Sequence, residues 1–467
     1  MSADRGDSRP RGGAGPHRPA RRRPRPSPRR RLPRGRSDVP SPARETALTV
    51  LLAAEQSGRF VADLVHRQIA DALVSRADRA LVTEMVNGVV RRRAMLDAVI
   101  AAYSDTKLWR LDGRLLWVLR LALYQMMCLT RVPARAAVDE AVRLARQHGL
   151  GHLAGFVNGI LRTMSRSLTP AGALADRVVV ARRVIPIDAE HTIVATRDVL
   201  PDPETDRVAH LAAAFSYPEW LVQRWLERFG PERVRAVLGA GNERPRIYLR
   251  ANRLRTTRDD LAARLAEAGV QTRPTDLPEG LELVRGRATD GSPARAQLAA
   301  TGGHALGGTL TNLPGFAEGL FYLQDLTAMG VAPRLRPQPG ERVFDLCAAP
   351  GGKATHLAEL MENTGEIVAA DQSPDRLARV AENAQRLGTD IVRTAPADQV
   401  AGEFDAVLLD APCTNTGVLA RRAEARWRLS DASLDRAVAE QTALFEEAAG
   451  RVRPGGRLLY STCSIEP

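Results

Sequence analysis

Two of the four cysteines in this chain follow short apolar segments that are typical of strands. Cys413 ends the run Val407-Leu-Leu-Asp-Ala-Pro-Cys, and Cys463 ends the run Leu459-Tyr-Ser-Thr-Cys. A thiolate that adds to carbon 6 of a pyrimidine lets carbon 5 attack an electrophilic methyl group, and loss of the carbon 5 proton then releases the thiol. The pair therefore predicts covalent catalysis. Structural burial of each cysteine and a disulfide between them are the open alternatives.

A glycine-rich segment, Asp345-Leu-Cys-Ala-Ala-Pro-Gly-Gly-Lys353, ends another apolar run and begins a helical pattern. Its glycines let the backbone approach a ligand, and Asp345 can hold an amine, but the spacing fits neither a dinucleotide fingerprint nor a P-loop. Asp371 ends the next strand, where a carboxylate accepts hydrogen bonds from ribose hydroxyls. These features predict S-adenosylmethionine, a nucleoside-bearing cofactor without pyrophosphate. The Asp410-Ala-Pro-Cys turn lacks the Asx-Pro-Pro-aromatic pattern common in amine methylation, which favours methylation of carbon.

The elements that must position these residues alternate between strands and helices. Strands are expected at Val343–Leu346, Ile367–Ala370, Val407–Leu409 and Arg457–Tyr460, and helices at Ala354–Met361, Pro374–Leu387 and Leu434–Ala449. This alternation predicts a parallel sheet with helices on both faces. Because the carboxyl ends of parallel strands meet at one edge, we expect the glycine-rich turn and both thiols to lie at the same edge.

Four further regions precede this domain, which we assign to residues 322–467. Residues 42–168 have the three- and four-residue apolar spacing of helices, with the last two helices near Ala134–His148 and Leu153–Ser165. Residues 169–211 are expected to form a linker or small hairpin, with strands at Arg177–Ile185 and Thr192–Thr196, and residues 212–321 an α+β subdomain. Residues 1–41 form an Arg- and Pro-rich tail that we expect to be disordered.

The formal charge of +13 is concentrated in that tail, since residues 1–44 hold fourteen arginines and three aspartates. Such an arm binds RNA phosphates without sequence preference or only solubilises the chain. No apolar run is long enough to span a bilayer, and no C-x-x-C pair offers zinc ligands. We therefore expect a cytoplasmic protein without a membrane or metal partner. Lys107 and Lys353 are the only lysines, and the second lies in the glycine-rich segment.

Several segments closely resemble RNA cytosine-5 methyltransferases of the Nop/Sun family, of the RsmB/Sun type. The resemblance is carried by Asp345–Lys353, Asp410–Gly417, Ser461–Ser464 and the leader Tyr322–Thr327. In addition, Ala154–Arg162 is similar to the last helix of the NusB fold. The resemblance implies a multidomain chain: an all-α NusB-like RNA-binding domain, a small α+β RNA-binding subdomain and an α/β Rossmann-like catalytic domain.

The same resemblance implies roles for individual residues. Cys463 is expected to be the nucleophile, Cys413 to assist release of the methylated base, and Asp410 to bind the flipped cytosine near nitrogen 3 and to border the cofactor. Asp371 is expected to bind the ribose and Asp398 to lie near the adenine. The remaining cofactor residues are those of the glycine-rich turn, Cys347, Ala348, Ala349, Pro350, Gly351, Gly352 and Lys353.

The implied activity is methylation of carbon 5 of a cytosine in 16S ribosomal RNA, by a monomer that uses S-adenosylmethionine. The same chemistry on transfer RNA and a non-catalytic role in RNA binding or ribosome assembly are the alternatives. Members of the family continue after the second cysteine motif with a further helix and two strands. Because this sequence stops at Pro467, we expect a domain truncated at its C-terminal end, with an exposed sheet edge.

Overall fold

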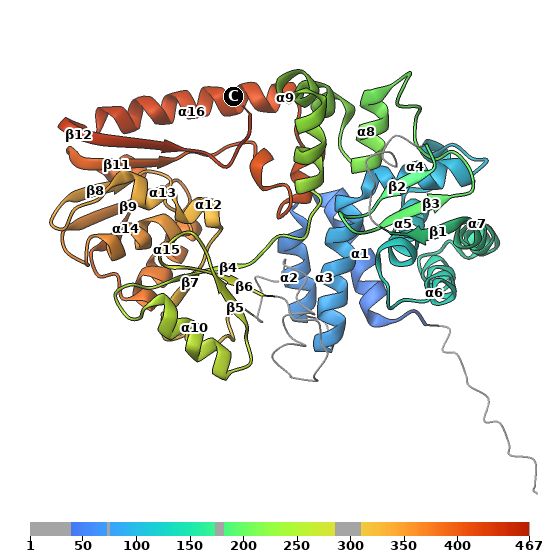
Figure 1. Ribbon diagram of the computed structural model, residues 1–467, viewed down its shortest axis with the longest axis horizontal. Helices are drawn as coiled ribbons and strands as arrows, with labels where there is room; N and C mark the ends of the chain where they lie inside the picture. The colour runs from blue at the N-terminus through green and yellow to red at the C-terminus, as the bar shows by residue number, and fades with distance from the viewer. Residues whose placement is uncertain (1–38, 72–74, 173–181, 285–309, 467) are drawn as a thin grey trace, which may run out of the picture. The chain divides into compact units, whose positions relative to one another are not determined.

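The computed structural model describes residues 39–71, 75–172, 182–284 and 310–466 (Figure 1). The arginine-rich tail was predicted to be disordered, and its residues 1–38 lie outside these ranges. Among the described helices, none combines the length and the apolar character needed to cross a membrane. Within the same ranges, no three or more His, Cys, Asp or Glu side chains are grouped as metal ligands.

The N-terminal region is all-helical, as expected. Its elements are α1 (Pro42–Ser57), α2 (Val61–Asp71), α3 (Arg76–Arg91), α4 (Arg93–Tyr103), η1 (Leu108–Arg110), α5 (Gly113–Cys128), α6 (Ala134–Gln147), η2 (Gly151–Leu153) and α7 (Ala154–Ser167). In α6 the buried positions are Ala137, Val138, Ala141, Leu144 and Ala145, the i, i+4, i+7 spacing of a helix with one apolar face. Helix α5 is buried around most of its circumference and forms the centre of this core.

A small antiparallel sheet follows the helices, in the order β1-β3-β2. Its strands are β1 (Leu168–Ala171), β2 (Val184–Pro186) and β3 (Thr192–Ala195). The predicted hairpin is present, because β2 pairs with β3, but the strand expected over Arg177–Ile185 is observed only from Val184. Its residues 177–181 lie outside the described ranges. Strand β1, which was not predicted, continues directly from α7.

The next region combines helices with a second antiparallel sheet, ordered β5-β6-β4-β7. Its elements are α8 (Arg207–Phe215), α9 (Glu219–Ala240), β4 (Tyr248–Ala251), α10 (Arg258–Glu267), β5 (Thr272–Pro274), β6 (Gly280–Leu283) and β7 (Phe321–Leu323). Helix α9 is kinked where Gly230 adopts a left-handed φ of 73° before Pro231. Leu249 and Phe321 pack with Leu261 and Leu265 of α10 in a core of their own.

The C-terminal region contains five parallel strands in the order β10-β9-β8-β11-β12. Its strands are β8 (Arg342–Asp345), β9 (Glu366–Asp371), β10 (Val392–Pro396), β11 (Phe404–Asp410) and β12 (Val452–Ser461). Its helices are α12 (Leu326–Met329), α13 (Val331–Leu335), α14 (Gly352–Leu360), α15 (Pro374–Leu387), η3 (Ala397–Gln399), η4 (Thr416–Val418), η5 (Ala423–Trp427) and α16 (Asp431–Gly450). The predicted doubly covered parallel sheet is confirmed, and β10 is an additional strand.

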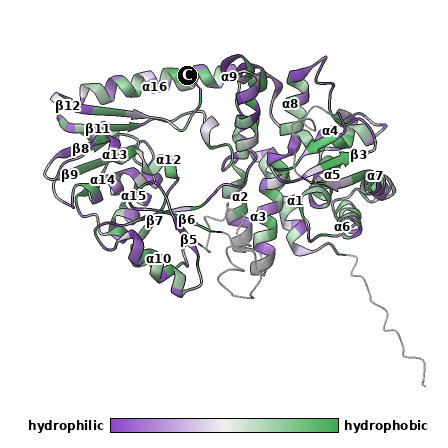
Figure 2. Ribbon diagram, viewed as in Figure 1, coloured by the Kyte–Doolittle hydropathy of each residue, from purple (hydrophilic) through white to green (hydrophobic). Residues whose placement is uncertain are grey.

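Successive residues of the central strands enter two different cores, as the two-residue period of a strand requires. Val343 and Leu408 pack against α13 and α14 on one face. Phe344 and Val407 pack on the other face, with Leu444 of α16. Between its terminal acidic residues β9 is hydrophobic throughout, as expected for a strand covered on both faces (Figure 2).

Strand β12 lies at one side of the sheet, with β11 as its only paired neighbour among the described residues. Helix α16 runs beside these two strands (Figure 1). Val438 and Phe445 on α16 and Tyr460 on β12 are large apolar side chains that are 56%, 46% and 41% exposed. Among the described residues, β12 is therefore an edge strand with exposed apolar side chains beside it.

Candidate active site

The two predicted catalytic cysteines lie in contact. Cys413 follows β11 and Cys463 follows β12, and these strands are paired in register, with Asp410 opposite Ser461. The two Sγ atoms are 2.9 Å apart, and both thiols are free. Asn415, in a left-handed conformation at φ 60°, donates from Nδ2 to the carbonyl of Cys413 and accepts at Oδ1 from the Cys463 thiol at 3.4 Å. The parallel pairing of two strands therefore creates the pair.

The close contact makes the acidities of the two thiols unequal. The hydrogen bond from Cys463 lowers the pKa of Cys413 to about 6, and it raises the pKa of Cys463, which donates. Either sulfur can be the donor, so movement of one proton between them exchanges the thiol and the thiolate. The pair therefore supplies a thiolate near neutral pH, which is the reactive form in nucleophilic catalysis.

The other two cysteines lack this activation. Burial raises the pKa of Cys347 to about 12, with further contributions from the charges of nearby carboxylates. Burial also raises the pKa of Cys128, at the end of α5, to about 12. Both thiols are therefore protonated at neutral pH.

Asp410, at the end of β11, is held by two neighbours. Its Oδ2 forms an ion pair with the ammonium group of Lys353, and its Oδ1 accepts a hydrogen bond of 2.7 Å from the hydroxyl of Ser461. Lys353 lies in the first turn of α14, so this contact connects the glycine-rich turn to the strand that precedes Cys413. The sequence placed Lys353 in the turn but did not predict that its charge meets Asp410.

Asp345, at the end of β8, is fully buried, and neither of its carboxylate oxygens has a hydrogen-bond partner among the described residues. Burial raises its pKa to about 7; the charge of Lys353 opposes this, whereas Asp410 and Asp371 add to it. A buried carboxylate without donors is unfavourable. The site therefore fits a ligand that brings a cationic amine, such as the methionine part of S-adenosylmethionine.

The glycine-rich turn between β8 and α14 is closely packed from outside the catalytic region. Gly351 has a left-handed φ of 97°, and a Cβ atom on Gly352 would lie 2.7 Å from the ring of Tyr322. The fully buried Arg250 of β4 donates to the carbonyl of Gly352 and to Glu359 Oε1, the latter at 2.8 Å. Sequence reasoning missed Arg250, although an arginine within the apolar strand pattern of 246–251 is an available signal.

Two further acidic residues were predicted to bind the cofactor. Asp371 ends β9, is 4% exposed, accepts a hydrogen bond from the amide of Ser373 and pairs with Arg376 at 3.2 Å. Asp398 is exposed on η3, just after β10. Asp345, Asp371 and Asp410 therefore end three of the parallel strands at one edge, whereas Asp398 lies on the segment after a fourth.

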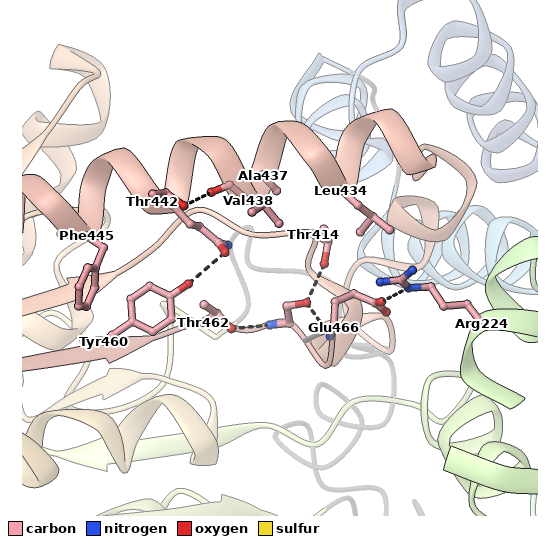
Figure 3. Close-up of a pocket in the computed structure, with 12 residues that line it drawn as sticks. Arg224, Thr414, Leu434, Ala437, Val438, Thr442, Phe445, Tyr460, Thr462 and Glu466 are labelled. Carbon is pink, nitrogen blue, oxygen red and sulfur yellow. Dashed lines mark hydrogen bonds and ion pairs between the residues drawn. The ribbon is translucent and has the colours of Figure 1, made fainter. Parts of the chain in front are cut away.

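A cavity of about 490 Å³ lies between α16 and the end of β12 (Figure 3). Thr414, Thr462 and Ser464, which line it, are sequence neighbours of Cys413 and Cys463. Tyr460 donates to Gln441 across the cavity, and Glu466 pairs with Arg224 at its other end. None of the residues predicted to be catalytic or cofactor-binding lines this space, although it adjoins both cysteine segments.

Three protein-family models match separate parts of the chain. They are the NusB family at residues 41–166, the ferredoxin-like domain of RsmF/B-like methyltransferases at 217–290, and the 16S rRNA methyltransferase RsmB/F family at 332–467. A probable ribosomal RNA small subunit methyltransferase B from Synechocystis is 34% identical over 433 residues, covering 91% of this chain and 86% of the relative. A Bacillus subtilis protein of the same description is 31% identical over 431 residues, covering 91% and 85%.

The chain belongs to the ribosomal RNA small subunit methyltransferase B family. The family resemblance, the NusB-like helical domain and the Rossmann-like catalytic domain predicted from the sequence are therefore confirmed. A solved structure described as PH0851 has the same fold, with a TM-score of 0.63 and 24% identity over 91% of this chain and 86% of that one. The protein is thus an RNA methyltransferase whose cofactor is S-adenosylmethionine, and the buried Asp345 carboxylate, which has no donor among the described residues, fits the amine of that cofactor.

Proposed function

We propose that this methyltransferase modifies carbon 5 of a cytosine in 16S ribosomal RNA through a covalent cysteine–RNA adduct. The observation that carries the proposal is the contact between Cys413 and Cys463 at the strand edge that also holds Asp345. A methyltransferase acting on an amine needs no thiol, whereas addition to carbon 6 of a pyrimidine requires a thiolate. The choice of ribosomal RNA follows the descriptions of the relatives, and we place the activity in the cytoplasm.

We assign the first step to Cys463. When Cys413 holds the shared proton, the Cys463 thiolate forms a bond to carbon 6 of the cytosine, and Asp410 binds the base near nitrogen 3. S-adenosylmethionine, when bound, supplies an electrophilic methyl group for carbon 5. Lys353 beside Asp410 supports this arrangement, because a neighbouring positive charge orients the carboxylate and balances its charge.

We assign the release step to Cys413. Once the Cys463 sulfur is bonded to carbon, the Cys413 thiol first releases its proton to solvent. The resulting Cys413 thiolate then takes the proton from carbon 5; the electron pair of that C–H bond forms the carbon 5–carbon 6 double bond, and the electron pair of the carbon 6–sulfur bond returns to Cys463. The 2.9 Å contact between the two sulfurs supports this role, because it places Cys413 beside the adduct that Cys463 forms. The target cytosine must leave the stack to reach both sulfurs, which favours an unpaired or flipped base.

Two cysteine variants test the mechanism with methyl-labelled cofactor and unmethylated 16S ribosomal RNA. Cys463→Ala is expected to abolish methylation while cofactor binding, measured by calorimetry, persists. Cys413→Ala is expected to accumulate a covalent protein–RNA adduct that is visible on a denaturing gel. Cys128→Ala is the matched control, since that thiol lies in the helical domain, and bisulfite sequencing identifies the product. Cytosine methylation by the Cys463→Ala variant would contradict the mechanism, and modification of transfer RNA alone would contradict the substrate.

A further inference from the structure

The connection between α4 and α5 carries an unusually exposed tryptophan. Trp109, in the short helix η1, is 73% exposed, more than any other large hydrophobic side chain among the described residues. By contrast, Trp117 and Trp225 are buried, and the remaining two tryptophans pack partly against the helical core. Aromatic side chains provide much of the contact energy in interfaces, so an exposed indole is a candidate contact site where its surroundings also point to a ligand.

The backbone around Trp109 is well held. The amide of Arg110 donates to the carbonyl of Lys107 at 2.9 Å, and the amide of Leu111 donates to that of Leu108 at 3.1 Å. The Leu108 side chain packs against the helical core, and η1 contacts α4. The indole is therefore presented on an ordered turn, so little conformational freedom is lost when a ligand covers it.

One cationic side chain contacts the indole, and others lie on the neighbouring residues and at the end of α4. The guanidinium carbon of Arg110 lies 4.7 Å from the Trp109 ring centroid, and Lys107, one of only two lysines in the chain, is exposed two residues before the ring. Tyr103 is the last residue of α4, and the guanidinium carbon of the exposed Arg197 lies 4.6 Å from its ring centroid. We call Tyr103, Lys107, Trp109, Arg110 and Arg197 the Trp109 surface.

Acidic side chains only partly offset this charge. Asp105 is exposed on the same connection, and Asp112 is already occupied by a 2.8 Å ion pair with Arg114. The exposed side chains next to Trp109 in the sequence are charged rather than apolar, which is unlike the hydrophobic centre of a protein–protein interface. Aromatic rings and guanidinium planes flanked by positive charge are instead the features on which unpaired bases stack while cations contact the phosphates.

We propose that the Trp109 surface binds a single-stranded segment of the substrate RNA, with one unpaired base stacked on Trp109 and flanking phosphates held by Lys107 and Arg110. This proposal rests on the proposed RNA substrate, and it specifies which part of the helical domain binds that RNA. Since Lys107, Trp109 and Arg110 belong to the α4–α5 connection and not to the thiol or cofactor site, they hold the RNA rather than take part in the chemistry. Their loss therefore raises the KM for RNA and leaves kcat unchanged.

The test uses Trp109→Ala and Trp109→Phe in the full-length protein, with Val194→Ala as a control that shortens another exposed apolar side chain. Loss of one stacked base weakens binding to poly(U) and to the 16S ribosomal RNA transcript by about five- to 150-fold for Trp109→Ala, with a smaller loss for Trp109→Phe. Lys107→Gln and Arg110→Gln each reduce the slope of log K against log salt by roughly 0.7.

Methylation measured on the same variants separates the two proposals. We expect Trp109→Ala to have a higher KM for RNA and an unchanged kcat. We also expect RNA to quench tryptophan fluorescence in wild type but not in Trp109→Phe. If wild type methylates the RNA and Trp109→Ala binds the RNA as tightly as wild type, the Trp109 surface is not an RNA-binding site. The exposed indole is then interpreted as a contact for a protein ligand. If wild-type protein binds RNA through Trp109 but methylates no cytosine, the proposed reaction fails and the binding surface stands.

Discussion

Replacement of the buried Asp345 carboxylate by an amide is expected to stabilise the free protein while abolishing its affinity for the cofactor. The carboxylate has no hydrogen-bond donor, and burial raises its pKa from 3.8 to about 7. At 1.36 kcal/mol per pKa unit, this shift corresponds to about 4 kcal/mol of lost stability when the group is ionised in the folded state. Asp345→Asn removes this cost, because asparagine carries no charge.

The pH dependence of the effect follows from the direction of the shift. Between about pH 4 and pH 7 the folded protein holds a proton that the unfolded chain has lost, so wild-type stability falls as the pH rises through this window. Above pH 7 the full cost is present. The stability advantage of Asp345→Asn is therefore largest at about pH 8 and shrinks toward pH 4.

Chemical denaturation at several pH values, with and without S-adenosylmethionine, measures both effects. The cofactor is expected to stabilise wild type strongly and the variant hardly at all, because the amine loses its carboxylate partner. Asp371→Asn is the matched control: this carboxylate is also buried at a strand end, but it has partners in Ser373 and Arg376, so its replacement gives no gain in stability. A variant Asp345→Asn that is less stable than wild type at pH 8, or that binds the cofactor normally, would refute the reasoning.

Two further predictions concern the thiol pair and the buried ion pair. Alkylation of Cys413 by iodoacetamide, followed by mass spectrometry, is expected to have a pH midpoint near 6 in wild type. The midpoint is expected to be higher in Cys463→Ala, because this variant lacks the hydrogen bond that lowers the pKa of Cys413. Equal midpoints in the two proteins would contradict the coupling between the thiols. Arg250→Met leaves Glu359 buried and unpaired, which is expected to cost about 3–5 kcal/mol in urea denaturation. The double variant Arg250→Met/Glu359→Leu is expected to regain most of that stability. It is not expected to regain cofactor affinity, because the carbonyl of Gly352 still lacks the hydrogen bond from Arg250. Full recovery of both stability and affinity would show that Arg250 does not position the turn.

The catalytic region was the most predictable part of the fold because its central strands carry clear signals. The strands ending at Asp345, Asp371 and Asp410 are continuous apolar runs, and the rule that parallel strands share an edge was enough to bring their ends together. Strand β10 reads Val392-Arg-Thr-Ala-Pro and is largely exposed, so neither a buried run nor an alternation marks it. Its place at the edge of the sheet depends on pairing with β9, which local sequence does not encode.

The side-chain contacts that complete the site were less predictable than the backbone. Motif spacing placed Cys413 and Cys463 at the same edge, but their 2.9 Å contact depends on the register between β11 and β12. The ion pair of Lys353 with Asp410 joins two motifs that the sequence could only treat separately. Such contacts are set by packing across the sheet, whereas motifs report only which residues are near a strand end.

The segment that follows Cys413 packs against the helical region and connects it to the catalytic region. Arg426 of η5 is fully buried, lies 3.9 Å from the ring centroid of Tyr217 and donates to the carbonyls of Ser216 and Gly241. Further contacts reach the first helices: the amide of Val61 donates to Glu424, Arg91 donates to the carbonyl of Ala420, and Trp427 donates to that of Val90.

The terminal nitrogens of the Arg426 guanidinium donate to two carbonyls and to Asn242 Oδ1, whereas its Nε has no partner among the described residues. These buried hydrogen bonds fix the η5 segment to its neighbours. The chain therefore runs from Cys413 directly into a segment held by the helices. In the proposed mechanism, RNA on the Trp109 surface and a base at the thiols would therefore be connected by one continuous packed structure.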